Sequence, residues 1–253
     1  MLRPRIIPSL LLHEKGLTKT KQFGEKKYVG DPINVVKIFN EKKVDELTIF
    51  DIDASRFGKD PDYKLIQNIS KESNMPICYG GGIKTLLQAQ KIISLGIEKI
   101  SLSSAPLDNI QIISEIAKVI GNQSVVCTLD IKHDKKSDNY QLWTHNATIK
   151  KDTDIISYIK EIQNQGVGEI IINSIDQDGM MMGYDLNMIN FFKQYISVPL
   201  SIVGGAGSIS HIQSAIDKFG LIGVSAGSLF IFKGPYRAVL INYPKKNDIK
   251  FEY

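Results

Sequence analysis

The sequence contains the same series of short motifs twice, at a nearly constant spacing. The paired segments are residues 6–11 and 125–130, 79–82 and 203–206, and 103–104 and 227–228, with a looser pair at 50–53 and 175–178. Their offsets are 119, 124, 124 and 125 residues, which indicates a duplicated half-protein with a short insertion after Asp130. Leu11 stands where the second copy has Asp130. A duplicated site should carry two facing carboxylates, and this chain has lost the first.

Short apolar runs alternate with longer segments of helical periodicity through both copies. The runs lie at residues 5–12, 46–51, 76–79, 99–102, 124–131, 169–173, 199–203 and 221–225. They lack strict polar alternation, which is typical of parallel strands covered on both faces. Eight strand–helix units, four in each copy, predict an α/β fold: a (β/α)8 TIM barrel made of two half-barrels. An open doubly wound sheet is the alternative, but it does not explain the constant offset.

The boundaries follow from the repeat. We expect one domain over residues 1–253, with half-barrels at about 1–120 and 121–245 and a short C-terminal tail. Asp31 followed by Pro32 predicts a helix start, because Asp is a good N-cap and Pro fits the first helical turn. Residues 152–154 offer an equivalent start in the second copy.

Composition argues against several classes of protein. The net charge of +4, from 31 basic and 27 acidic residues, is too weak and scattered to predict nucleic-acid binding. No apolar run reaches the roughly 18 residues that a membrane span needs. Cys78 and Cys127 lie in apolar runs without metal-ligand spacing, so we expect buried thiols, a cytoplasmic protein, and neither a metal nor a cofactor.

Glycines at two equivalent places predict a pair of phosphate sites. Each cluster ends a strand and precedes a helix, where bare backbone N–H groups and the helix dipole attract an anion. A hydroxyl-bearing pair follows the next strand in each copy. The predicted phosphate contacts are Gly81, Gly82, Ser103 and Ser104 in the first copy, and Gly204, Gly205, Gly227 and Ser228 in the second. We therefore expect a ligand with a phosphate at each end.

Three segments depart from the barrel pattern. Residues 12–30 are too long for an ordinary loop, carry five lysines including Lys19, and predict a mobile lid over an anionic ligand, with a solvated basic loop as the alternative. Residues 133–146 indicate a hairpin inserted after the fifth strand. Residues 180–182 are three methionines, which predict a soft contact surface for a ligand or partner, with ordinary loop variability as the alternative.

These motifs resemble one family along essentially the whole chain, the cyclase subunit of imidazole glycerol phosphate synthase. The resemblance rests on Arg5-Ile6-Ile7, Gly30-Asp31-Pro32, Asp45-Glu46-Leu47, Asp51 with Ala54-Ser55, Gly80-Gly81-Gly82-Ile83, Ser174-Ile175-Asp176, Asp178-Gly179, Gly183-Tyr184-Asp185 and Gly204-Gly205-Ala206-Gly207. The sister isomerase of the pathway shares the half-barrel plan and both phosphate sites. The segments 30–32 and 183–185 favour the cyclase.

The resemblance implies a glutaminase partner, which forms a heterodimer by docking at the N-terminal face of the barrel. Ammonia then passes through the barrel to a bis-phosphorylated ribonucleotide. Two aspartates act as acid and base in this family; Asp130 matches the second, and the first falls on Leu11. The resemblance also implies substrate contacts at Lys19, Asp51, Asp178 and Gly179.

Four charged residues at strand starts match the ammonia gate of that family. They are Arg5, Glu46, Lys99 and Glu169, which alternate in sign. Without the resemblance, a solvated rim would be the plainer interpretation. With it, we expect a closed ring of ion pairs around an entrance.

The missing acid leaves two functions open. One is the family reaction, cleavage and cyclisation, impaired unless Asp51, Asp53, Asp176 or His13 has taken over proton transfer; for His13 a spectator role is the plainer interpretation. The other is a conduit that delivers ammonia to a nucleotide-activated sugar in surface-polysaccharide synthesis, with a third, synthetase subunit doing the chemistry. A phosphosugar isomerase needs the same two acids and meets the same objection.

Overall fold

Parallel strands close on themselves at the centre of the molecule. The computed structural model describes residues 3–245 and 248–250. Among these, eight parallel strands follow the order β10, β11, β12, β1, β4, β5, β6, β7, and β7 pairs with β10 to close the barrel. The bounds are β1 Arg5–His13, β4 Leu47–Asp51, β5 Ile77–Gly80, β6 Lys99–Leu102, β7 Val125–Asp134, β10 Glu169–Ser174, β11 Leu200–Val203 and β12 Gly223–Ala226. The predicted (β/α)8 barrel is confirmed, with four strands from each copy of the repeat.

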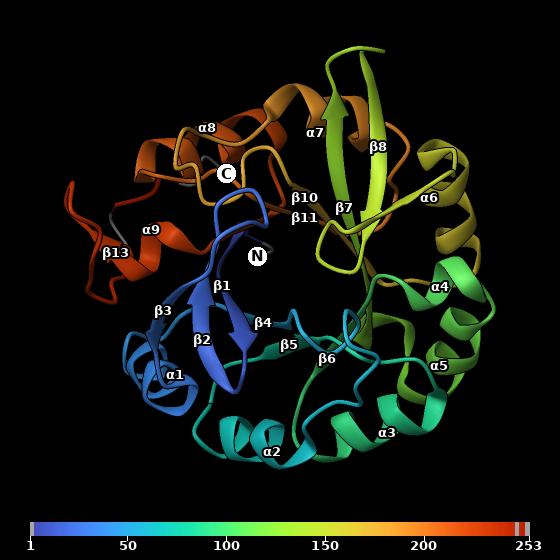
Figure 1. Ribbon diagram of the computed structural model, residues 1–253, viewed down its shortest axis with the longest axis horizontal. Coiled ribbons are helices and arrows are strands. Elements are labelled where there is room, and N and C mark those ends of the chain that lie inside the picture. Colours follow the sequence, from blue (N-terminus) through green and yellow to red (C-terminus); the bar gives the residue numbers. More distant parts are fainter. Residues whose placement is uncertain (1–2, 246–247, 251–253) are drawn as a thin grey trace.

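Helices surround this barrel (Figure 1). Their bounds are α1 Pro32–Glu41, α2 Tyr63–Lys71, α3 Leu86–Ser94, α4 Ala105–Asp108, α5 Ile112–Ile120, α6 Ile155–Asn164, α7 Leu186–Lys193, α8 Ile209–Phe219 and α9 Ser228–Ile231. The predicted helix starts are confirmed: Asp31 caps α1 by accepting from the Asn34 N–H at 2.9 Å, and Asp154 caps α6 by accepting from the Ser157 N–H at 2.8 Å. Within the described ranges, every helix is too short or too polar to cross a membrane.

The segment after the first strand is more ordered than the sequence indicated. Strand β1 continues to His13 and turns back through β2 (Gly16–Lys19), which pairs with β3 (Lys27–Gly30). The predicted loop at 12–30 is therefore largely an antiparallel extension of the barrel sheet. Short strands of four residues with mixed polarity carry too weak a pattern to be predicted.

The insertion after the fifth strand is the predicted hairpin. Strand β7 runs past the barrel and pairs antiparallel with β8 (Asn139–Thr144), from Asp130 opposite Trp143 to Asp134 opposite Asn139. A third strand, β9 (Ile149–Lys151), follows. In the turn between β8 and β9, His145, Asn146 and Ala147 all have left-handed backbone, with φ between 55° and 59°.

Candidate functional site

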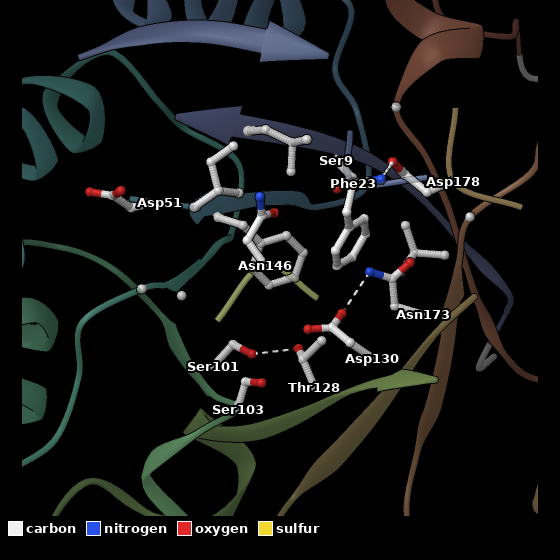
Figure 2. A pocket seen from close by; sticks show the side chains of 18 of the residues that line it. Ser9, Phe23, Asp51, Ser101, Ser103, Thr128, Asp130, Asn146, Asn173 and Asp178 are labelled. Atoms are coloured by element: carbon white, nitrogen blue, oxygen red, sulfur yellow. Dashed lines mark hydrogen bonds between the residues drawn. The ribbon is translucent and has the colours of Figure 1, made fainter. Parts of the chain in front are cut away.

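A cavity opens at the carboxyl ends of the barrel strands (Figure 2). Every residue predicted to contact ligand lines it: Lys19, Asp51, Gly81, Gly82, Ser103, Ser104, Asp130, Asp178, Gly179, Gly204, Gly205, Gly227 and Ser228. They come from distant parts of both repeats and meet because parallel strands of a barrel end at one face. The structure therefore brings the predicted contact residues together, while their roles in binding stay predictions.

The backbone conformation of both glycine clusters requires glycine. Gly81 has a φ of 129°, and a Cβ there would lie 2.6 Å from the carbonyl oxygen of Asp51. Gly205 has a φ of 112°, and its Cβ would lie 2.0 Å from the carbonyl oxygen of Gly183. Any other side chain would be strained at both turns. The two turns thus leave backbone exposed on the cavity wall, as a phosphate site needs.

Lys19 brings a buried ammonium group to the second cluster. Its Nζ donates to the carbonyl oxygen of Ser9. A Cβ on Gly227 would lie 2.4 Å from the same Nζ. Burial lowers the pKa of Lys19 to about 8, and the nearby Asp178 carboxylate opposes that shift. A cation held in a low-dielectric wall beside a glycine turn suits a bound anion.

Asp130 lies on β7, the fifth strand of the barrel, and its carboxyl group lines the cavity. Burial raises the pKa of Asp130 to about 7; the hydrogen bond from Asn173 Nδ2, at 2.8 Å, opposes the rise, and repulsion from Asp178 adds to it. A carboxyl with a pKa near neutral can both give and take a proton at cellular pH. Leu11 lines the same cavity and has no proton to move.

The residues considered as replacements for the missing acid lie in different places. Asp51 lines the cavity; burial raises its pKa, while the N–H groups of Asp53 and Ala54 oppose the rise. His13 instead has its Nδ1 2.9 Å from both carboxylate oxygens of Asp53. Asp176 accepts from the His133 N–H at 2.8 Å. Neither His13, Asp53 nor Asp176 is in the cavity wall, which leaves Asp51 as the candidate within it.

Hydrogen bonds to Asp178 hold the segment at 20–23 beside the cavity. Its carboxylate accepts from Thr20 Oγ1 at 2.7 Å and from the Phe23 N–H at 3.4 Å, and its backbone carbonyl accepts from the Gln22 N–H at 2.8 Å. The Phe23 ring points into the cavity (Figure 2). The predicted lid position is therefore occupied, while its mobility stays a prediction.

Several lining residues were missed at the level of sequence: Ser9, Phe23, Ser101, Thr128, His145, Asn146 and Asn173. Ser101 and Thr128 face each other across neighbouring strands with hydroxyl oxygens 2.6 Å apart. Strand alternation could have found this pair: Thr128 precedes Asp130 by two positions on β7, and Ser101 precedes Ser103, which directly follows β6, by two positions. His145 and Asn146 had no such signal, since they reach the cavity through a turn.

The methionine segment at 180–182 lies on the rim. Met182 is 76% exposed and Met180 is 40% exposed. Met181 has a φ of 62°. Its carbonyl oxygen packs against Gly207, and a Cβ on Gly207 would lie 2.1 Å from that oxygen. The backbone of the segment is thus fixed against the second glycine cluster while two side chains face outward.

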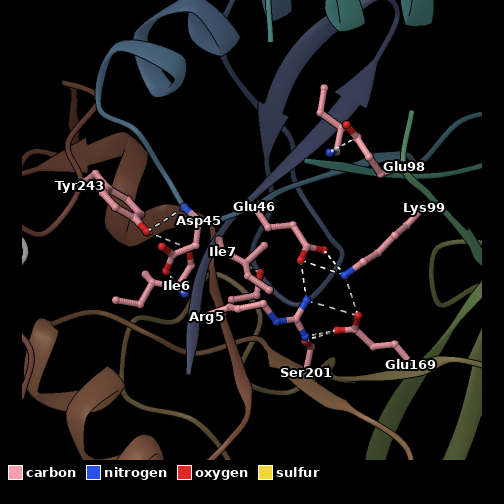
Figure 3. A network of polar contacts seen from close by, with 12 residues as sticks. Arg5, Ile6, Ile7, Asp45, Glu46, Glu98, Lys99, Glu169, Ser201 and Tyr243 are labelled. Atoms are coloured by element: carbon pink, nitrogen blue, oxygen red, sulfur yellow. Dashed lines mark hydrogen bonds and ion pairs between the residues drawn. The ribbon is translucent and has the colours of Figure 1, made fainter. Parts of the chain in front are cut away.

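At the opposite end of the barrel, four charges form a closed ring (Figure 3). Arg5 pairs with Glu46 and, at 2.7 Å, with Glu169, and Lys99 Nζ lies 2.9 Å from a carboxylate oxygen of each. Burial raises the pKa of Glu169, but attraction and hydrogen bonding from Arg5 and attraction from Lys99 outweigh it and lower the pKa. Ser201 Oγ also donates to Glu169. The predicted ring is present; its role as an ammonia gate stays a prediction.

An apolar collar separates the ring from the cavity. Cys78, Val126 and Ile171 are buried together inside the barrel, against Phe50 and Val203, which line the cavity. Ile171 follows Glu169 by two residues on β10, so it lies on the same face of the strand, one step closer to the mouth. Among the described residues, no group of three or more His, Cys, Asp or Glu side chains is placed to hold a metal ion.

Sequence comparison relates the chain to known proteins over almost its full length. The profile of the family described as "Histidine biosynthesis protein" matches residues 5–236. The "Putative imidazole glycerol phosphate synthase subunit hisF3" of Vibrio vulnificus (strain YJ016) is 53% identical over 250 residues, 99% of this chain and 96% of that protein. The "Putative imidazole glycerol phosphate synthase subunit HisF" of Leptospira borgpetersenii is 51% identical over 248 residues, 98% of each. The "Imidazole glycerol phosphate synthase subunit HisF" of Bacillus subtilis (strain 168) is 33% identical over 233 residues, 92% of each.

Proposed function

This chain belongs to the histidine biosynthesis protein family, and on that premise we propose that it is a cyclase-type subunit of imidazole glycerol phosphate synthase. It receives ammonia from a glutaminase subunit docked below the Arg5–Glu46–Lys99–Glu169 ring. The ammonia reacts at the cavity with a ribonucleotide that carries two phosphates. We expect the pair of subunits to work in the cytoplasm, which suits the free buried thiols of Cys78 and Cys127.

One observation carries this proposal: the charged ring and the ligand cavity occupy the two ends of one barrel. The ring is a set of mutually neutralised charges, and the collar beyond it is apolar. A small neutral molecule crosses such an interior at far lower cost than an ion, because burial of a charge is costly. Ammonia fits that description, and ammonium does not.

At the mouth, the two glycine turns receive the phosphates and Asp130 handles protons. The turn at Gly81 belongs to the first repeat and the turn at Gly205 to the second, which suits a ligand with an anionic group at each end. Asp130, with a pKa of about 7, serves as the general acid and base. Loss of a partner acid at Leu11 costs about 10²–10⁴-fold in rate, the usual contribution of one such group.

Leu11 also favours a second candidate function, the ammonia conduit. In this case the ring and collar operate as above, but the cavity holds its ligand without cyclising it. Ammonia then leaves for a carboxyl or acetamido group of a nucleotide-activated sugar, and a third, synthetase subunit catalyses its incorporation. The conduit function needs no second acid, so it is not impaired by Leu11.

Turnover of the histidine-pathway precursor with ammonia, measured on the full chain and on Leu11→Asp, separates the two functions. If the chain is an impaired cyclase, Leu11→Asp raises the rate by about 10²-fold or more because it restores the facing acid. Leu221→Asp, which makes the same change at a side chain that is 61% exposed, serves as the control and leaves the rate unchanged.

Affinity capture with the full chain as bait provides the complementary result. Recovery of a glutaminase alone, with turnover by the pair, supports the cyclase. Recovery of a glutaminase together with a synthetase, and no turnover by either the parent chain or Leu11→Asp, contradicts the cyclase and supports the conduit.

A further inference from the structure

Asn173 and Asp130 face each other across the seam that closes the barrel. They are directly paired in the parallel register of β10 and β7. Asn173 Nδ2 donates to Asp130 Oδ1 at 2.8 Å. Since strand register fixes both backbones, the hydrogen bond is built into the sheet and does not depend on a loop.

While Nδ2 of Asn173 makes this bond, in the described part of the chain the other polar atom of the same amide is left without a partner. Its Oδ1 is buried and has no hydrogen-bond partner among the described residues. It lies beside Gly204, where an added Cβ would be 3.2 Å away. Buried polar atoms without a partner are uncommon in native proteins, and where one persists a functional reason is to be sought. An apolar side chain here would avoid the unpaired oxygen but would also remove the donor to Asp130.

The second oxygen of Asp130 is left for the ligand. In Figure 2 one carboxylate oxygen of Asp130 meets Asn173, and the other points away from it into the cavity. The other charged or titratable side chains in the cavity wall are Lys19, Asp51, His145 and Asp178. Among these, Asp178 acts on Asp130 by repulsion. Leu11 supplies no charge from the equivalent strand of the first repeat.

We propose that Asn173 is the positioning residue of Asp130: it holds Oδ1 in place and leaves Oδ2 as the oxygen through which Asp130 exchanges protons with the ligand. The inference rests on the proposed function in taking ammonia as the nucleophile, a ligand in the cavity as its target and Asp130 as the acid and base. The lone pair of ammonia forms the new N–C bond at a C=O carbon of the ligand, and the C=O π pair moves onto that oxygen. Oδ2 takes a proton from the cationic nitrogen and then gives it to the oxygen anion, which restores the carboxylate.

The test is a titration of the Asp130 side-chain carboxyl by carbon NMR on the ligand-free chain, with the signal assigned from Asp130→Asn. Asn173→Leu removes the donor to the charged form, so the Asp130 midpoint should rise by about one pH unit, a tenfold gain in proton affinity. Asn190→Leu, the same change at an exposed position of α7, should leave the midpoint where it is. An unchanged midpoint in a folded Asn173→Leu chain overturns the proposal.

Asn173→Asp keeps the shape of the side chain, and so tests the pair if the leucine variant does not fold. Two carboxyls in direct register should share one proton and titrate in two well-separated steps. A single step at the parent midpoint would show that the two groups do not interact, and would overturn the proposal. Because neither titration needs a ligand, shifted midpoints in a chain without turnover support the positioning role and contradict the cyclase reaction alone.

Discussion

Ser201 and Gly223 interlock on the neighbouring strands β11 and β12. They are paired in register, and a Cβ on Gly223 would lie 1.9 Å from Ser201 Oγ. The absence of a side chain at Gly223 therefore gives the Ser201 hydroxyl its room. That hydroxyl donates to Glu169 and accepts from Arg5 Nη2 at 3.3 Å, so the glycine supports the charged ring from one strand away.

Gly223→Ala should destabilise the fold by about 1–3 kcal/mol, as an overpacked core does, because Ser201 is forced off its rotamer. Combined with Ser201→Ala, the same change should cost less than the two single variants added together, since the clashing oxygen is gone. Urea unfolding of the four chains gives the coupling. Strict additivity would show that the two positions are independent.

Lys99→Met should leave Glu46 and Glu169 facing each other with only Arg5 between them. Removing one member of a largely buried ion pair costs about 2–4 kcal/mol at neutral pH. Lys37→Met, which breaks an exposed pair with Glu72, is the control and should cost less than about 1 kcal/mol. Urea unfolding at neutral pH measures both losses, and equal losses would contradict a special role for the ring.

The same ring should weaken in acid. The pKa of Glu169 is lowered in the folded chain from an ordinary value of 4.5, so its contribution to stability is complete above that value and is lost as pH falls below it. Chemical denaturation from pH 6 to pH 3 should therefore show a decline that Glu169→Gln reduces. A decline of the same size in the variant would assign the acid sensitivity to other carboxylates.

Asp130 should have the opposite effect on stability. Burial raises its pKa from 3.8 to about 7, so the folded chain binds a proton that the unfolded chain releases, and stability falls as pH rises through that interval. Asp130→Asn should therefore gain stability relative to the parent at pH 8, on the order of 2–4 kcal/mol, and little at pH 4. The difference between the two chains is measured by urea unfolding at both pH values. A gap independent of pH would contradict a titrating carboxyl at this position.

Lys19 should make phosphate binding depend on pH above neutrality. Its pKa of about 8 means that the ammonium loses its proton between pH 7 and pH 9, while a phosphate monoester, with a second pKa near 6, keeps its charge. Calorimetry with glycerol phosphate should show affinity falling by up to about tenfold over that range. Lys19→Met should bind weakly at both pH values, and Lys15→Met, at an exposed lysine, should behave as the parent does. A parent affinity independent of pH would place the phosphate elsewhere.

The barrel strands were predictable from sequence because each coincides with a short run rich in Ile, Val and Leu that recurs between segments of helical periodicity. The predicted run at 169–173 and the observed strand Glu169–Ser174 differ by one residue. The glycine turns were predictable because the repeat shows them twice. The hairpin built from Gly16–Lys19 and Lys27–Gly30 was not, because pairing with the extended end of β1 stabilises strands whose own pattern is weak.

The polar lining of the cavity was only partly predictable. Asp130 stood out because its counterpart in the repeat is Leu11. Asn173 did not, since asparagine is a common turn residue, and only the register with β7 shows its partner. His145 and Asn146 reach the cavity through left-handed backbone in the turn after β8, which no spacing in the sequence reveals.

The closing seam between β7 and β10 lies wholly within the second repeat. Asp130, its hydrogen-bond partner Asn173 and the glycines at 204 and 205 therefore all belong to one half-barrel. The first half contributes Lys19, Asp51 and the other glycine turn to the cavity wall, and it has Leu11 at the position equivalent to Asp130. On the proposal that Asp130 transfers the protons, substitutions near Leu11 can change which ligands the cavity accepts and leave the half-barrel that holds Asp130 unaltered.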